Sequence, residues 1–173
     1  KLSMMWLFTL LIARPVFAGG YAEERNVVKN GNVPLVAVSL ADSIRGSLGW
    51  YAWSQVGPTY AQAYVGPTVS PTTRLQVGGA LGLEQAASNE RFGSFVWLGA
   101  GRWSLLGVYE DGGSGPFRKA VGRCRFGPTQ IGLWYDNYLG AGPYLETAIP
   151  NTPLTLWGTV CQNATQVAVR MTF

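Results

Sequence analysis

Strict alternation of apolar and other side chains is the feature that most constrains how this chain can fold. At the C-terminus, Val167, Val169, Met171 and Phe173 fall on one face of an extended segment, and the residues between them fall on the other. Segments 59–70, 74–84, 129–139 and 153–162 repeat this pattern, and helical periodicity is missing. Clusters of Gly, Pro, Asn, Asp and Ser interrupt the pattern about every 10 to 14 residues, as between strands of a barrel. The sequence therefore predicts an all-β chain that closes as an antiparallel barrel.

Two kinds of barrel share such alternation, and composition favours one of them. A soluble barrel of the lipocalin type turns its apolar set inward, whereas a membrane barrel turns that set toward lipid and keeps a polar lumen. Charged residues make up only 13% of this chain, against about 25% in an ordinary soluble domain. The less apolar faces are also rich in Gly, Ala and aromatic residues, which would cover a soluble surface poorly. We therefore expect a transmembrane barrel, with a secreted soluble barrel that binds an apolar ligand as the alternative.

Residues 1–18, KLSMMWLFTLLIARPVFA, have the pattern of a cleaved signal peptide. Lys1 supplies the positive start, an apolar run follows, and Val16 and Ala18 are the small residues expected before a cleavage site. The apolar run is shorter than the roughly 20 residues that a membrane-spanning helix needs. We therefore expect two parts, a signal peptide over 1–18 and a single barrel domain over 19–173.

With this leader and this strand ladder, the chain resembles outer-membrane β-barrel proteins of Gram-negative bacteria. The resemblance includes the last strand, TQVAVRMTF, which ends on Phe173 like the signal read by the barrel-assembly machinery. It implies an outer-membrane location, contact with outer-membrane lipid and lipopolysaccharide, and an assembly signal made by Val167, Val169, Met171 and Phe173. It also implies that the C-terminus lies in the periplasm. It does not identify a particular family.

Counting strands backward from Phe173 reaches ten at about Ser47. Residues 34–41 form one further candidate strand, and an even total then requires a partner from 20–29. We favour ten strands over twelve because the segment Ala22 to Lys29 is charged and shows no clear alternation.

The chain has no His, which removes the usual general base and the commonest metal ligand. Its carboxylates are expected to pair with lumenal Arg, since buried charges are normally paired. We therefore predict no enzyme activity, no cofactor and no metal site. No basic run typical of nucleic-acid binding occurs, so nucleic acid is not an expected partner.

The predicted inward faces carry most of the charge. We place in the lumen Arg74, Gln76, Glu84, Lys119, Arg123, Arg125, Asp136, Glu146 and Arg170. These residues can form a cationic constriction that favours anions or sugars, or a salt-bridged plug, because the interior of a small barrel is filled by side chains. Trp97, Trp134 and Trp157 also fall on inward faces and are candidates for stacking on a ligand, with packing against lumenal Gly as the alternative.

Cys124 and Cys161 are predicted to face opposite sides of the wall, toward opposite ends of their strands. A disulfide needs Cα atoms within about 7 Å, so we predict that these two residues do not pair.

These observations predict an integral outer-membrane barrel, either a narrow passive pore for a small polar solute or a structural and surface-binding element. A barrel that belongs to a larger export or translocation system is a further alternative.

Overall fold

The computed structural model describes residues 19–29, 31–86 and 88–173, so the predicted signal peptide over 1–18 lies outside the described residues. The described part of the chain forms twelve strands. They are β1 (Gly19–Val28), β2 (Asn32–Arg45), β3 (Leu48–Val56), β4 (Ala61–Thr72), β5 (Leu75–Glu84), β6 (Glu90–Ala100), β7 (Trp103–Gly112), β8 (Phe117–Phe126), β9 (Thr129–Asp136), β10 (Gly140–Ala148), β11 (Leu154–Val160) and β12 (Thr165–Thr172).

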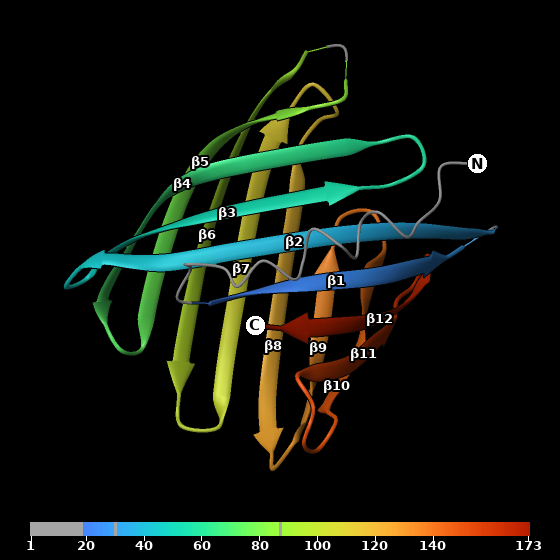
Figure 1. The fold of residues 1–173 in the computed structure, drawn as a ribbon. Coiled ribbons are helices and arrows are strands. Elements are labelled where there is room, and N and C mark those ends of the chain that lie inside the picture. Colours follow the sequence, from blue (N-terminus) through green and yellow to red (C-terminus); the bar gives the residue numbers. More distant parts are fainter. Residues whose placement is uncertain (1–18, 30, 87) are drawn as a thin grey trace.

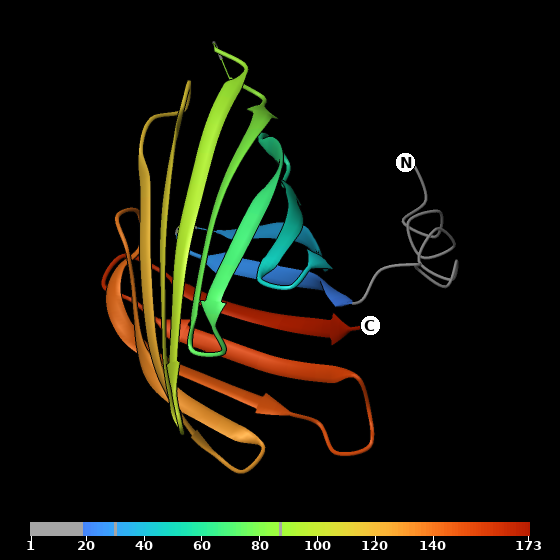
Figure 2. The same ribbon diagram turned by 90° about the vertical axis from the view of Figure 1, so that its left-hand side faces the viewer.

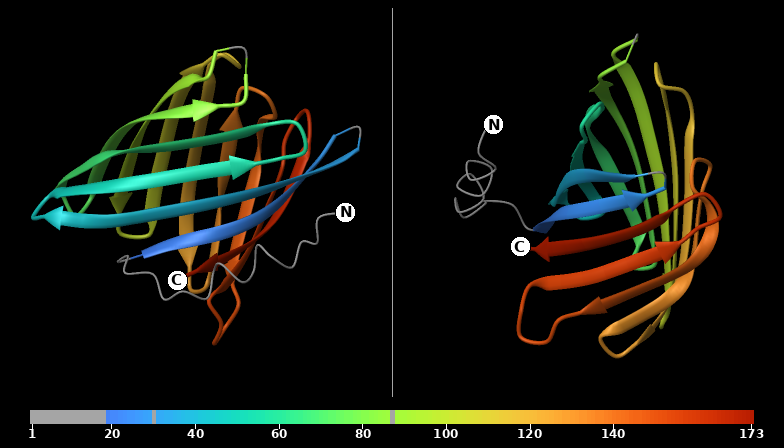
Figure 3. Two further views of the ribbon diagram at one scale, coloured as in Figure 1. Left: turned by 45° about the horizontal axis from the view of Figure 1, so that its top comes forward. Right: turned by 90° about the vertical axis from the view of Figure 1, so that its right-hand side faces the viewer.

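Each strand pairs antiparallel with its neighbours in sequence, and β1 pairs with β12 to close the barrel. At this seam Gly20 N donates to Phe173 O at 3.0 Å, and Phe173 N donates to Gly20 O at 3.1 Å. The strands are steeply tilted, so that β2 and β3 cross in front of β7 and β8 (Figure 1). Two further views show β1 and β12 side by side along the seam (Figures 2 and 3).

The preference for ten strands over twelve was wrong, because β1 is part of the wall. Its charged residues do alternate: Glu23 is buried and Arg25 half-buried, while Glu24 between them is exposed. Glu23 and Arg25 face the lumen, where their charges are paired. A strand with charges on its inward face lacks the apolar alternation that marks the other strands.

Apolar side chains cover the outside of the wall, and the large buried side chains lie inside it. Leu81 is 72% exposed, Val167 51% and Val169 44%, whereas Trp134 on an inward position is 4% exposed. The predicted orientation of the two faces is therefore confirmed. In the described residues no helix is long and apolar enough to cross a membrane.

Short connections define two rims. The β2–β3, β4–β5, β6–β7, β8–β9 and β10–β11 turns lie at the same end as Gly19 and Phe173, which we call the C-terminal rim; the other connections form the opposite rim. Gly101 and Gly127 begin two-residue turns at the C-terminal rim with φ near +61°. Such a φ is strained for any residue with a Cβ atom, and tight hairpins use Gly there for that reason.

Candidate lumen site

Inside the barrel, the polar side chains form two ion-paired clusters with an open chamber beside them. The first cluster is centred on Arg91 at the start of β6, near the opposite rim. Its guanidinium contacts Glu84 at 2.8 Å and Glu110 at 3.1 Å, and its Nε donates to the Tyr64 hydroxyl at 3.3 Å. All four side chains are buried, so this charge is paired where water is scarce.

Two residues from the rim connections join this Arg91 cluster. Ser114 donates to Glu84 through its hydroxyl at 2.6 Å and its backbone N at 2.9 Å, and Tyr60 donates its hydroxyl to Glu84 at 2.8 Å. Burial raises the pKa of Tyr60 to about 12, so its hydroxyl stays protonated and able to donate well into the alkaline range. Glu84 thereby ties the β3–β4 and β7–β8 connections to the wall.

The second cluster begins at Glu23 in β1. Its carboxylate contacts Arg25 at 2.7 Å and Arg170 at 2.8 Å, and it accepts a hydrogen bond from Trp157 Nε1 at 2.8 Å. Arg170 lies on β12, directly across the seam from Glu23 in the strand register.

Glu146 in β10 extends this second cluster around the wall. It contacts Arg170 at 3.2 Å and Arg123 at 3.8 Å, and it accepts hydrogen bonds from Gln130 at 2.6 Å and from the Tyr144 hydroxyl. The Glu23–Glu146 cluster therefore links β1 and β12 to β8, β9 and β10 near the C-terminal rim.

Aromatic rings pack between the clusters on the β9–β11 side. Trp134 stacks on Trp157 with ring centroids 5.4 Å apart and on Tyr144 at 6.0 Å. The Lys119 ammonium lies 4.3 Å from the Trp134 ring centroid, in the range of a cation–π contact. Asp136 accepts a hydrogen bond from Trp134 Nε1 at 2.8 Å and others from the backbone N atoms that follow it in the β9–β10 turn.

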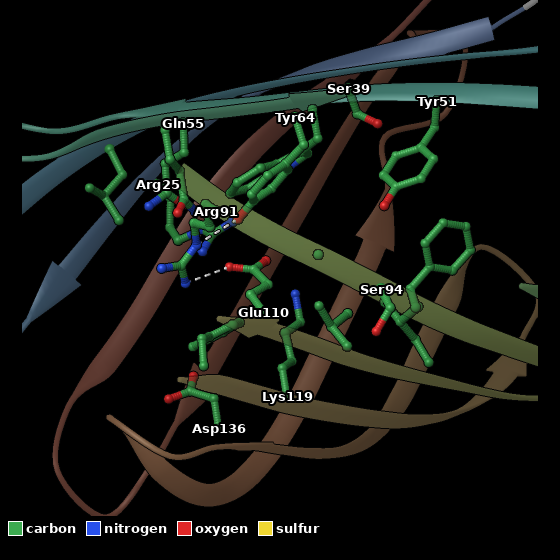
Figure 4. Close-up of a pocket in the computed structure, with 18 of the residues that line it drawn as sticks. Arg25, Ser39, Tyr51, Gln55, Tyr64, Arg91, Ser94, Glu110, Lys119 and Asp136 are labelled. Carbon is green, nitrogen blue, oxygen red and sulfur yellow. Dashed lines mark hydrogen bonds and ion pairs between the residues drawn. The ribbon is translucent and has the colours of Figure 1, made fainter. Parts of the chain in front are cut away.

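A chamber of about 620 Å³ occupies the lumen beside these groups. The close-up shows Arg91 and Glu110 on one side of this space, with Lys119 reaching into it from the strand below (Figure 4). The lining also includes apolar and aromatic residues, among them Tyr51, Trp53, Phe95, Leu106, Val108 and Phe117, and hydroxyl and amide residues such as Ser39, Gln55, Gln76 and Ser94. The chamber thus combines apolar and aromatic side chains with uncharged polar groups and a few ionised ones.

Most of the predicted lumen residues do line the interior. Glu84 lies in the Arg91 cluster, Arg123, Glu146 and Arg170 lie in the Glu23–Glu146 cluster, and Gln76, Lys119 and Asp136 line the chamber. Two others lie near the C-terminal rim. Arg125 is exposed there but lies within β8, opposite Gln130 in the register and on the same face as Arg123. Arg74 lies exposed in the β4–β5 turn, beside an apolar groove on the outer wall, where the alternation of a strand no longer decides the direction of its side chain.

The three Trp residues that we predict as candidates for stacking on a ligand lie in two different places. Trp134 and Trp157 stack on each other, and Trp134 borders the chamber. Trp97 instead folds back over Gly99, where its ring fills the space that a Cβ atom would need. Trp97 therefore follows the alternative prediction, in which the ring packs against a lumenal glycine.

The predicted lumen residues do not include Arg91, Glu110, Glu23, Arg25 and Tyr64. Arg91 follows a segment assigned to a loop, Glu110 begins another, and Glu23 and Arg25 lie on the strand that was not favoured. Glu110 does pair with a lumenal Arg, as expected for the carboxylates. For Arg91 and Glu110 the signal was present as period-two alternation with a neighbouring inward residue, such as Gly93 after Arg91.

The predicted cationic constriction is not seen in these clusters, because their charges balance. Five cations, Arg25, Arg91, Lys119, Arg123 and Arg170, face five carboxylates, Glu23, Glu84, Glu110, Asp136 and Glu146. The lumen is therefore polar and ionised without a net excess of either sign from these groups.

Cys124 and Cys161 are free thiols on different faces. Cys161 lies in the lumenal core with Trp157, while Cys124 pairs in register with Trp103 and Ile131, whose side chains are exposed on the outer wall. Among the described residues no group of three or more His, Cys, Asp or Glu side chains is placed to hold a metal ion.

Comparison with known proteins finds similar folds but no similar sequence. No protein-family model and no curated protein sequence matches this chain. Among solved structures, the KdgM porin superposes with a TM-score of 0.61 at 12% identity, covering 88% of this chain and 98% of KdgM. The chain therefore has a closed β-barrel fold similar to that of the KdgM porin.

Two further structures agree with this fold. A structure of the KdgM porin in complex with disordered oligogalacturonate gives the same TM-score, identity and coverage. The Acinetobacter baumannii outer membrane protein Omp33 superposes with a TM-score of 0.55 at 6% identity, covering 90% of this chain and 96% of Omp33. At such identities the likeness concerns the fold alone.

Proposed function

We propose that this chain is an integral outer-membrane barrel of a Gram-negative bacterium that works as a narrow passive pore for small polar solutes. The observation that carries this proposal is a closed wall, apolar outside, around an ionised lumen with a chamber of about 620 Å³. In this arrangement the C-terminal rim faces the periplasm and the opposite rim faces the outside.

The outer wall supports the membrane location. Residues such as Leu81, Leu133 and Val160 are exposed around the barrel, and an apolar surface of that extent in water would favour aggregation. A closed barrel satisfies all strand hydrogen bonds without an edge, which is the condition for crossing hydrocarbon with strands. The soluble lipocalin-like alternative is therefore not favoured.

The lumen supports a pore that is narrow. Barrels of about eight strands are filled by side chains, and open porins have about 16; twelve strands lie between. The two ion-paired clusters narrow the passage further, although they leave the chamber free. We therefore expect a low conductance.

The ionised groups also argue against catalysis. Glu84 and Glu110 are held by Arg91, and Glu146 by Arg170, so these carboxylates are engaged in structural ion pairs. With no His in the chain, we propose that the barrel conducts solutes and carries out no reaction.

The last strand serves assembly in this proposal. Val167 and Val169 are exposed on the outer wall, and the backbone of Phe173 pairs with Gly20 at the seam. We propose that Val167, Val169, Met171 and Phe173 are recognised by the barrel-assembly machinery, and that the finished wall contacts membrane lipid and lipopolysaccharide.

Planar-bilayer recording of the refolded protein tests the pore. We expect a small unitary current with weak ion selectivity, because the lumenal charges balance. Val108→Trp, which adds bulk to a residue lining the chamber, should lower the unitary current. Val96→Trp adds the same bulk on the outer wall and should leave it unchanged. A well-folded barrel without unitary current would refute the pore and leave a structural barrel.

A further inference from the structure

We propose that the chamber beside Lys119 binds an amphipathic monoanion, a small solute with an aromatic or aliphatic body and a single carboxylate. This inference rests on the proposed function, since it names the class of solute that would enter such a pore.

Lys119 is the proposed anchor. Among the cations of the two clusters and the chamber, it is the one that makes no ion pair with a carboxylate within 4.0 Å. Arg25, Arg91, Arg123 and Arg170 each make an ion pair within 4.0 Å. In the described part of the chain the contact of Lys119 is with the Trp134 ring, 4.3 Å from its ammonium. A lysine ammonium has three N–H donors, and a ring face does not satisfy all of them.

The carboxylates nearest to Lys119 already have other partners. Asp136 is opposite Lys119 in the strand register, but its two oxygens accept hydrogen bonds from Trp134 and from the backbone of the β9–β10 turn. Glu110 lies on the neighbouring strand β7, diagonal to Lys119 in the register and beside it in Figure 4, and its carboxylate is paired with Arg91 at 3.1 Å. A carboxylate from solution can therefore reach Lys119 without displacing an ion pair.

Part of the chamber suits an apolar body. Tyr51, Phe95, Leu106, Val108, Phe117 and Leu139 are among its lining residues, and small-molecule sites typically combine such apolar and aromatic side chains with a small number of polar groups. The volume of about 620 Å³ exceeds that of a single aromatic ring with a short acid side chain and lies within the range of small-molecule sites.

The number of unpaired charges limits the ligand to one anionic group. A polyanionic chain needs a row of unpaired cations. The guanidiniums of the two clusters are already paired with Glu23, Glu84, Glu110 and Glu146.

The test is a set of binding titrations on the folded protein in detergent, in which binding is measured by tryptophan fluorescence or calorimetry. The probes are 3-phenylpropionate, its neutral amide, and D-galacturonate as a polar monoanion. We expect 3-phenylpropionate to bind at least tenfold more tightly than either of the other two, because a charge-assisted hydrogen bond and apolar burial act together. Equal binding of D-galacturonate or of the amide would overturn the proposal.

Variants then locate the site. Lys119→Gln should weaken 3-phenylpropionate binding by about tenfold or more, and Lys119→Arg should restore most of it. Arg118→Gln removes one positive charge from the next residue on β8, whose side chain is exposed, and should bind like the unmodified protein. Wild-type binding by Lys119→Gln, or an equal loss in Arg118→Gln, would overturn the proposal.

Conductance of the same preparation separates this inference from the proposed function. A barrel that conducts but does not bind 3-phenylpropionate refutes the inference and leaves the pore. A barrel that binds the probe through Lys119 but carries no current supports the site and refutes the pore.

Discussion

Glu23 and Arg170 face each other across the seam where the first and last strands close the barrel. They are direct partners in the β1–β12 register, and their charged groups lie 2.8 Å apart although 147 residues separate them along the chain. Glu23 is almost fully buried and also holds Arg25 and Trp157. One carboxylate thus satisfies groups on three strands at the position where closure depends on long-range pairing.

Removing the negative charge of Glu23 should destabilise the barrel. Glu23→Gln leaves Arg25 without its carboxylate in the lumen, and we expect a loss of about 1.5–3 kcal/mol in the free energy of unfolding, the range for hydrogen bonds to charged groups. Urea unfolding followed by tryptophan fluorescence measures it. Glu24→Gln, the same change on the exposed outer face of β1, should cost less than about 0.5 kcal/mol. Equal losses would show that the seam contact does not stabilise the fold.

Alternation along the chain was enough to predict the faces of the wall. It assigned Trp134, Asp136 and Trp157 inward and Leu81 and Val169 outward, because a β-strand has a strict period of two. It failed for β1, where the inward residues are themselves charged and the contrast between faces disappears. The partners that make Glu23 a favourable inward residue come from β12 and β11, and no local pattern reveals them.

Arginine on the outer wall should cost more at mid-strand than at the rim. Val96 lies in the middle of β6 and Ile44 near the C-terminal rim, and both side chains are exposed. In lipid bilayers we expect Val96→Arg to lower the free energy of unfolding by about 2–4 kcal/mol and Ile44→Arg by about 0–1 kcal/mol. Reversible unfolding from liposomes measures both. Two small, equal effects would contradict a lipid-facing wall.

Gly132 should tolerate no side chain, whereas Gly122 should. A Cβ atom on Gly132 would collide with the backbone carbonyl of Gly122, but a Cβ atom on Gly122 would meet nothing within 4 Å. We expect Gly132→Ala to cost about 1–3 kcal/mol of stability, as overpacking does, and Gly122→Ala to stay within about 0.5 kcal/mol of the unmodified protein. Urea midpoints in one detergent compare the pair. A Gly132→Ala midpoint equal to that of Gly122→Ala would argue against the close strand contact.

Tyr60 should titrate above the other accessible phenols, since burial raises its pKa to about 12. The neutral phenol is the form that the folded barrel favours. Its contribution to stability is therefore complete below pH 10 and is lost as the pH rises through 12. The difference in absorbance at about 295 nm between the unmodified protein and Tyr60→Phe, recorded against pH, isolates this group. A difference centred near pH 10 would contradict its burial against Glu84.

The lumen was harder to predict than the wall, because its function depends on which charges meet. The sequence indicates that Lys119, Arg123 and Glu146 point inward, but not that Glu146 pairs with Arg123 and Arg170 while Lys119 lies on an aromatic ring. Those pairings depend on register and strand tilt across the barrel, which link residues far apart in the sequence.

Two adjacent leucines test the central claim most directly. Leu105 is exposed on the outer wall, and Leu106 lines the chamber. Each is replaced by Cys in a Cys124→Ser, Cys161→Ser background, labelled with a nitroxide and reconstituted in bilayers. Collisions with oxygen, which concentrates in hydrocarbon, should dominate at residue 105, and collisions with a water-soluble nickel chelate should dominate at residue 106. The reverse result would mean that the apolar face is turned inward, and the membrane barrel would be refuted.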